Sequence, residues 1–188
     1  DRMRHAKSGN WWEHAGHRAL ANNSVSYTEK PDMETFLREW TALVESKSGE
    51  RGIFNRQASK KQAAKNGRRD TEWEFGTNPC SEIILRPYQF CNLSEVVVRA
   101  TDDLKSLSNK VRLATIIGTL QSSLTKFPYL RKVWQTNTEE ERLLGVSLTG
   151  IMDNPLLTAK NKGLAQTLDH LRLVAVDTNK EWSERLGV

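Results

Sequence analysis

Two cysteines, Cys80 and Cys91, are the only ones in this chain of 188 residues, and each lies beside polar groups that a thiol reaction could use. Asn78, Cys80 and Glu82 alternate along the sequence. In an extended segment, alternate side chains project from the same face. This spacing would bring an amide, a thiol and a carboxylate within reach of one small molecule. The segment therefore predicts a site for thiol chemistry on a bound substrate.

The cysteine count limits the kinds of site that the chain can hold. Two thiols without the spacing of Cys/His metal ligands argue against a disulfide scaffold and against a structural zinc site, and they leave a redox pair open. We therefore expect no metal ion bound by these residues. Taken singly, a buried cysteine is usually a small hydrophobic residue, and Asn78-Pro79 is an ordinary turn. The functional prediction rests on the joint pattern.

The elements around these residues alternate between strands and helices. Strands are predicted at Val25–Thr28, Ser81–Leu85, Glu95–Arg99 and Gly145–Ile151. Helices are predicted from Pro31 to a stop at Gly49, from Phe54 to about Lys65, from Asp102 to the break before Pro128, at Thr138–Leu144 and at Asn161–Leu186. Strands separated by long helices indicate an α/β layer or barrel.

Two of the predicted helices carry apolar residues at intervals of three and four, which indicates a buried face. In the helix that follows Pro31 these positions are Met33, Phe36, Leu37, Trp40, Leu43 and Val44. In the helix that follows Asp102 they are Leu104, Leu107, Val111, Ala114, Ile117, Leu120 and Leu124. The Thr138 helix is predicted from capping-box spacing, because Glu141 follows Thr138 by three residues.

Composition indicates one domain with a substantial core and no internal boundary within residues 1–188, although the chain is fairly polar, with 37% hydrophobic and 27% charged residues. No apolar run approaches the ~20 residues that span a bilayer, and the first residues lack the apolar core of a signal peptide. We therefore expect a cytoplasmic protein without a membrane partner. Because the chain starts with Asp, we also expect a piece of a longer or split protein.

Positive charge is concentrated in one stretch, which we call the basic segment. It holds seven cations and no acidic residue, and these are Arg51, Arg56, Lys60, Lys61, Lys65, Arg68 and Arg69. Such a segment can be a solvated face, a nucleic-acid surface or the lining of a phosphate site. No aromatic residues interleave with the charges, which weakens a role in stacking on single strands. A basic α/β nucleic-acid-binding module remains an alternative function.

The order Asn-Pro-Cys-Ser-Glu at 78–82, followed by Phe-Cys-Asn-Leu-Ser-Glu at 90–95, resembles the active-site finger loop of ribonucleotide reductase large subunits. The likeness is greatest to the adenosylcobalamin-dependent class, whose members are often ribonucleoside-triphosphate reductases. It extends along nearly the whole chain and includes the segments 7–13, 19–24, 46–56 and 140–150.

This resemblance implies one portion of a ten-stranded α/β barrel, with the finger loop at the barrel centre, and an activity that reduces ribonucleotides to 2′-deoxyribonucleotides. Cys80 matches the thiyl-radical residue, Glu82 the general base on the 3′-hydroxyl, and Asn78 the amide that holds the substrate. Cys91 matches one member of a reducing dithiol whose partner cysteine is absent here. We therefore expect no disulfide between Cys80 and Cys91.

The resemblance also implies adenosylcobalamin as the cofactor, a ribonucleotide substrate, a nucleotide effector, and a thioredoxin-type or dithiol reductant. Cofactor-binding residues are not identified, and part of the specificity loop is expected between Ser8 and Arg18. The residues at positions 11–13 and 84–93 favour the cobalamin class. A tyrosyl-radical (class I) reductase shares the four site roles and remains an alternative.

Several parts of such an enzyme have no counterpart in these 188 residues. They are the first redox cysteine, the loop that grips the substrate phosphate, the C-terminal cysteines and most of the cobalamin surface. We therefore expect a central part of a reductase that is inactive in isolation and requires the remaining segments of the same enzyme. A purely structural half that must assemble with another chain is a further alternative, because barrel strands alone would leave unpaired edges.

Overall fold

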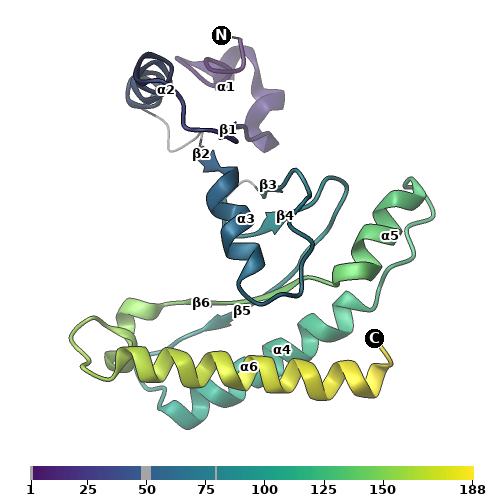
Figure 1. Ribbon diagram of the computed structural model, residues 1–188. Helices are drawn as coiled ribbons and strands as arrows, with labels where there is room; N and C mark the ends of the chain where they lie inside the picture. Colours follow the sequence, from purple (N-terminus) through teal and green to yellow (C-terminus); the bar gives the residue numbers. More distant parts are fainter. Residues whose placement is uncertain (1, 48–51, 79) are drawn as a thin grey trace. The chain divides into compact units, whose positions relative to one another are not determined.

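The computed structural model describes residues 2–47, 52–78 and 80–188 (Figure 1). It separates into two compact units, Asp1–Pro87 and Tyr88–Val188, which we call the N-terminal and the C-terminal unit. The sequence pattern did not predict this separation. The expectation that residues 1–188 form one undivided part of a catalytic barrel stays a prediction.

The N-terminal unit contains a parallel strand pair joined by a helix. Strand β1 (Ser24–Tyr27) pairs in parallel with β2 (Gly52–Asn55), and helix α2 (Met33–Ser46) lies between them in sequence. A parallel pair needs such a crossover connection, usually a helix. Asp32 caps α2 by accepting the Thr35 N–H at 2.8 Å, and this hydrogen bond lowers the pKa of the Asp32 carboxyl.

Helix α2 forms where it is predicted, but the prediction that its whole apolar stripe is buried is wrong. Four of the six stripe positions are exposed, and these are Met33, Leu37, Trp40 and Val44. The buried residues of α2 are Glu39 and Ala42. A nitrogen of the Arg4 guanidinium lies 2.6 Å from a carboxylate oxygen of Glu39. This ion pair from a distant segment explains why a charged position of α2 faces inward, which no local pattern shows.

The basic helix begins later than predicted. Phe54 lies in β2, and helix α3 spans Arg56–Ala64. The side chain of Asn55 accepts the Ala58 N–H at 2.9 Å and so caps α3. The preceding residues are a strand because they pair with β1, and that tertiary contact is invisible to a local pattern.

Four short elements complete the N-terminal unit: α1 (Trp11–His14), the 3-10 helix η1 (Gly16–Leu20), β3 (Gly76–Thr77) and β4 (Ile84–Leu85). The strand predicted at Ser81–Leu85 is thus reduced to β4, and β3 was not predicted. The segment between Ser8 and Arg18, expected to hold part of the specificity loop, contains the single helical turn α1.

The C-terminal unit is built on a second parallel pair. Strands β5 (Asn92–Val97) and β6 (Leu144–Thr149) pair along their full length, from Asn92 opposite Leu144 to Val97 opposite Thr149. Helix α4 (Leu104–Ser122) packs against both strands, and helix α6 (Leu164–Leu186) lies along α4 (Figure 1). The core of this unit is Val96, Val98, Leu107, Val111, Ala114, Leu157 and Leu171.

The apolar face of α4 is only partly the one predicted. Leu107, Val111 and Ala114 are buried, whereas Ile117 is 59% exposed. Leu124, which is 71% exposed, lies beyond the end of α4 at Ser122. In the second half of the helix the buried positions include Thr115, Gly118, Thr119 and Ser122. Each of these three hydroxyls donates to a main-chain carbonyl one turn earlier, so burial leaves no polar group unsatisfied. Small polar residues therefore replace leucines at the inner face.

The helix predicted at Thr138–Leu144 is wrong in its start. Helix α5 spans Lys132–Glu141, so Thr138 lies inside it, 2% exposed. Arg142, with a φ of 42°, ends the helix in the left-handed region. The acidic run that indicated a helix start therefore forms the last turn. Two 3-10 helices, η2 (Ile151–Asp153) and η3 (Pro155–Leu157), connect β6 to α6.

The prediction of a mixed α/β fold is confirmed, since each unit pairs parallel strands across a helix. The ten-stranded barrel stays a prediction, because the strands of the described residues form two-stranded sheets. No helix within the described ranges has the length and apolar character needed to cross a membrane.

Candidate functional site

Strands β3 and β4 form a short antiparallel hairpin, which we call the Cys80 hairpin. Its ladder has the pairs Gly76–Leu85 and Thr77–Ile84. The loop between them, residues 78–83, carries the three alternating candidates. One position in it, Pro79, lies outside the described residues.

The hairpin loop is a tight turn, so the extended arrangement considered for Asn78, Cys80 and Glu82 is wrong. The Ser81 N–H donates to the Asn78 carbonyl at 3.0 Å, and Ser81 has a φ of 66°. A left-handed residue reverses the chain and ends the alternation of faces. The three candidates thus lie in one turn rather than on one face of a strand.

Asn78 closes this turn. Its Oδ1 accepts the Ile83 N–H at 3.0 Å, and its own N–H donates to the Ile83 carbonyl at 3.4 Å. Because a main-chain N–H can only donate, the side-chain atom that it meets must be the oxygen. The amide NH₂ group of Asn78 therefore takes no part in this bond.

Cys80 and Glu82 are both exposed, and Asn78 is half-buried. An exposed thiol at a hairpin tip is accessible to a second reactant, which a buried structural cysteine is not.

Cys91 belongs to the C-terminal unit, where it is half-buried and directly precedes β5. The next residue, Asn92, donates to the Leu143 carbonyl through both its main-chain N–H (2.9 Å) and its side chain (3.0 Å). The two cysteines thus lie in different units, and both are thiols rather than a disulfide.

Asn78 also lines a cavity of about 220 Å³ in the N-terminal unit. The lining consists mainly of amide and hydroxyl side chains and one guanidinium, from Asn22, Asn23, Ser24, Ser26, Phe54, Arg56, Gly76, Thr77 and Asn78. Asn22, Asn23 and Ser24 belong to the segment 19–24, which resembles the same family as the Asn78 segment, but no role was predicted for them. This shared resemblance was the signal that could have placed both segments at one site.

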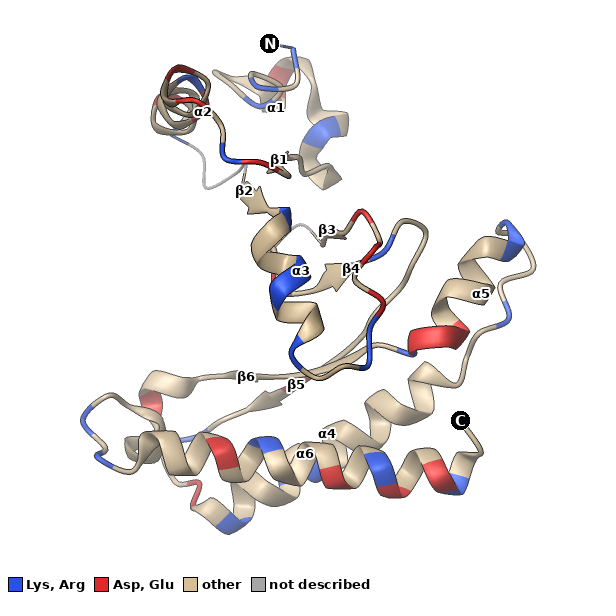
Figure 2. Cartoon of the chain, in the orientation of Figure 1, with Lys and Arg blue, Asp and Glu red and all other residues tan. Residues whose placement is uncertain are grey.

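The basic segment is partly committed to contacts inside its own unit. Arg56 and Lys60 form ion pairs with Glu74 at 2.9 and 3.6 Å. Arg69 donates to the Ile84 carbonyl at 3.0 Å. Arg51 lies outside the described residues, and Figure 2 shows the remaining cations along and after α3. Because of these contacts, fewer cations of the basic segment are available to bind a polyanion than the sequence alone indicates.

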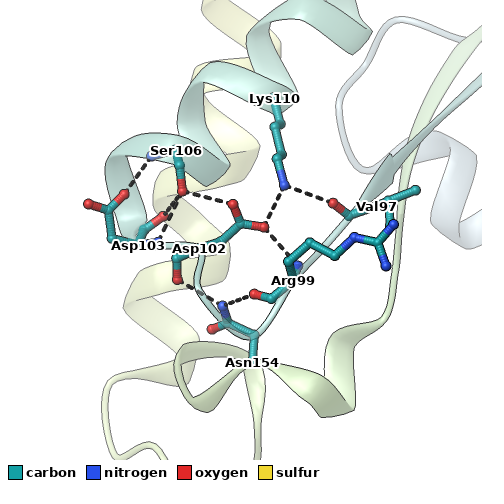
Figure 3. A network of polar contacts seen from close by, with 7 residues as sticks. All are labelled: Val97, Arg99, Asp102, Asp103, Ser106, Lys110 and Asn154. Carbon is teal, nitrogen blue, oxygen red and sulfur yellow. Dashed lines mark hydrogen bonds and ion pairs between the residues drawn. The ribbon is translucent and has the colours of Figure 1, made fainter.

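A polar network supports the C-terminal unit at the end of β5 (Figure 3). The Asp102 carboxylate accepts from Lys110 Nζ at 2.6 Å, from the Arg99 N–H at 2.7 Å and from the Ser106 hydroxyl at 3.0 Å. The bond from Lys110, followed by that from Arg99, lowers the pKa of Asp102. The fully buried Asn154 donates to the Arg99 and Asp102 carbonyls at 2.8 Å each. The network ties the start of α4 to the turn after β6.

Within the described residues, no three His, Cys, Asp or Glu side chains gather in a way that could hold a metal ion.

The chain is similar to two curated proteins named adenosylcobalamin-dependent ribonucleoside-triphosphate reductase. It is 33% identical to the protein from Lacticaseibacillus paracasei over 142 residues, which cover 73% of this chain and 18% of that protein. It is 28% identical to the protein from Lactobacillus gasseri over 202 residues, which cover 91% of this chain and 26% of that protein. The chain therefore spans about a fifth to a quarter of the length of these relatives, and the resemblance stated from the sequence is confirmed.

No protein-family model matches the chain, and no solved structure matches it.

Proposed function

We propose, from its similarity to these two reductases, that the chain is a central part of an adenosylcobalamin-dependent ribonucleotide reductase and carries its radical cysteine. The observation that carries this proposal is the Cys80 hairpin. It presents an exposed thiol together with a carboxylate and an amide in one closed turn.

Cys80 is proposed as the thiyl-radical residue. The C2′–OH bond of a ribose is poorly activated, and a radical at C3′ makes its cleavage accessible. The Cys80 sulfur radical takes the hydrogen atom from C3′, which forms an S–H bond and breaks a C–H bond of similar strength. That similarity makes the transfer reversible, so the hydrogen atom can be returned to C3′ at the end of the cycle.

Glu82 is proposed as the general base that takes the proton of the 3′-hydroxyl and later returns it. This role requires hydrogen-bond reach to that hydroxyl, and the exposed position of Glu82 in the same loop leaves its carboxylate accessible to a ligand. Asn78 is proposed to hold the substrate through its NH₂ group, because its Oδ1 is used by the Ile83 N–H. A fixed orientation supplies part of the rate.

Cys91 is proposed as one member of the reducing dithiol. Over one cycle, a ribonucleotide and two thiols give a deoxyribonucleotide, a disulfide and water, so the electrons balance. The partner cysteine is absent from this chain, and a thioredoxin-type or dithiol reductant would then restore the thiols.

Adenosylcobalamin is proposed as the cofactor on the names of the relatives. When bound, it supplies the radical from which the thiyl radical is generated. The exposed sulfur of Cys80 fits this role, since hydrogen-atom transfer requires close approach of the two partners. Cys80 is the residue of this chain that would face the cofactor.

The remaining proposals concern the whole enzyme. We propose that the parallel pairs β1–β2 and β5–β6 belong to a ten-stranded barrel. The segment from Ser8 to Arg18, which contains α1, is proposed as part of the loop that responds to a nucleotide effector.

The proposal is tested by grafting. The matching segment of the Lacticaseibacillus paracasei protein is replaced by this chain, and deoxyribonucleotide formation is measured anaerobically with a dithiol, with and without adenosylcobalamin. The expected result is product that requires adenosylcobalamin.

A folded chimera that forms product only with a separate radical-generating subunit would retain the chemistry and overturn the cofactor. A folded chimera that forms no product with adenosylcobalamin and none with such a subunit would contradict the proposed function.

A further inference from the structure

The basic segment meets the Cys80 hairpin at Phe75, the residue before β3. Phe75 is fully buried. Its carbonyl accepts the Arg56 Nε–H at 2.8 Å, and its ring lies 4.8 Å from the Arg69 guanidinium carbon. Two cations of the basic segment thus contact the same residue at the entrance of the hairpin.

Arg69 reaches the second strand as well. Its guanidinium donates to the Ile84 carbonyl of β4 at 3.0 Å while it lies over the Phe75 ring next to β3. A planar guanidinium can stack and donate at once, which a point-charge ammonium does less well. Arg69 therefore links β4 to the residue directly before β3 through one side chain.

Arg56 anchors the same entrance to the rest of the N-terminal unit. Besides the Phe75 carbonyl, it donates to the Thr28 hydroxyl at 2.7 Å, just after β1, and it pairs with Glu74 at 2.9 Å. Its side chain is 21% exposed.

The hairpin needs such support because its own ladder is very short. It consists of the pairs Gly76–Leu85 and Thr77–Ile84, and isolated two-stranded hairpins are marginal in water. The bond between Asn78 and Ile83 that closes the loop depends on Ile84 and Thr77 staying in register.

We propose that Arg69, supported by Arg56, is a positioning residue that fixes the loop carrying Asn78, Cys80 and Glu82. We call the contacts of Arg69 and Arg56 with the hairpin the brace. The brace is a structural proposal, and only its effect on catalysis rests on the proposed function. The basic segment thereby acquires a role in place of polyanion binding.

The test compares Arg69→Met, Arg69→Lys and the control Lys61→Met. Lys61 is an exposed cation of α3, so the control removes the same charge from the same segment. Amide hydrogen exchange is measured at Ile83, with Val111 in the core of the C-terminal unit as the internal reference. The kcat and KM are measured in the chimera described above.

Arg69→Met is expected to speed amide exchange at Ile83 by about tenfold or more and to leave exchange at Val111 unchanged. The reason is that the hydrogen bond to the Ile84 carbonyl and the contact of the guanidinium with the Phe75 ring are both lost. In the chimera kcat falls by about tenfold and KM changes little, as for a group that orients the reacting side chains. Arg69→Lys, whose ammonium can donate to the Ile84 carbonyl but stacks less well on the Phe75 ring, should have a smaller effect on both than Arg69→Met. Lys61→Met changes neither.

Unchanged exchange at Ile83 in Arg69→Met overturns the brace, and so does equal acceleration at Val111, which reports general unfolding. Should Arg69→Met fail to fold, faster exchange at Ile83 in Arg69→Lys with Val111 unchanged supports the brace, and native-like exchange at Ile83 or equal acceleration at Val111 opposes it. If the unmodified chimera is inactive while Ile83 responds as expected, the proposed function fails and the brace stands. Loss of binding to random DNA in Arg69→Met with native exchange at Ile83 would favour a nucleic-acid surface instead.

Discussion

At the scale of single residues, the oxygen and the NH₂ group of the Asn78 side chain have different tasks. Its oxygen accepts the Ile83 N–H and closes the loop that carries Cys80. Its NH₂ group is the part left for a substrate. The proposed mechanism therefore uses Asn78 as a hydrogen-bond donor, and this assignment follows from the donor character of the Ile83 N–H.

Two substitutions separate these tasks. Asn78→Asp keeps an acceptor for the Ile83 N–H and removes the donors, whereas Asn78→Ala removes both. We expect Asn78→Asp to keep native exchange at the Ile83 amide and to lower kcat/KM by about tenfold, the value of one hydrogen bond of about 1.4 kcal/mol. Asn78→Ala should lose activity and also speed Ile83 exchange.

Exchange at Ile83 measured by NMR, together with steady-state kinetics of the chimera, checks this prediction. Full activity in Asn78→Asp would show that the NH₂ group does not contact the substrate.

That Asn78, Cys80 and Glu82 share one short loop follows from their spacing in the sequence. The turn does not, because it depends on the bond from Ile83 and on a left-handed φ at Ser81, a residue type without a strong preference for that region. The contacts of Arg69 were equally hidden, since they join residues through the tertiary fold.

At the scale of elements, the network around Asp102 connects the end of β5, the start of α4 and the turn after β6 (Figure 3). The hydrogen bond from Lys110, with that from Arg99, holds the pKa of Asp102 below its usual value. A carboxyl whose pKa is lowered in the folded state stabilises the fold above its unfolded pKa of about 3.9. This contribution is lost as the pH falls through the lower folded value.

Asp102→Asn should therefore lower the midpoint of thermal unfolding at neutral pH, and the difference from the native chain should shrink below about pH 4. Thermal melts followed by circular dichroism between about pH 3 and pH 7 measure this difference. This interval includes the ordinary pKa of a carboxyl group, which is about 4.

The matched control is Asp169→Asn on α6, whose carboxylate is 71% exposed and pairs with Arg172 at 3.4 Å. An exposed pair of this kind contributes little, so the control should melt like the native chain. A pH-independent difference for Asp102→Asn would contradict the role given to its charge.

Helix α4 shows how far an element can be predicted. Its existence follows from its apolar period, although it ends at Ser122 rather than at the break before Pro128. Leu107, Val111 and Ala114 are buried as expected. Its second half turns Thr115 and Thr119 inward instead, and Asn179 of α6 donates to the Thr119 hydroxyl at 3.0 Å. The face of a helix depends on its partner helix, which a single periodic pattern does not specify.

At the scale of the whole molecule, the α/β class was predictable because parallel strands alternate with helices in sequence. The separation into two units at Pro87 and Tyr88 was not, since it reflects the distribution of contacts rather than any composition change. Cys80 and Cys91 fall on different sides of this boundary. The proposed reaction gives them different tasks, hydrogen-atom transfer for Cys80 and electron supply for Cys91.

Release of the C3′ hydrogen distinguishes the task proposed for Cys80 from the task proposed for Cys91. The chimera is incubated with adenosylcobalamin and a ribonucleotide tritiated at C3′, and both tritium release and deoxyribonucleotide are measured in Cys80→Ser and Cys91→Ser. Cys80→Ser should give neither signal, because the sulfur proposed to take the hydrogen atom is missing. Cys91→Ser should still release tritium while forming no sustained product. Tritium release that persists in folded Cys80→Ser would contradict the account.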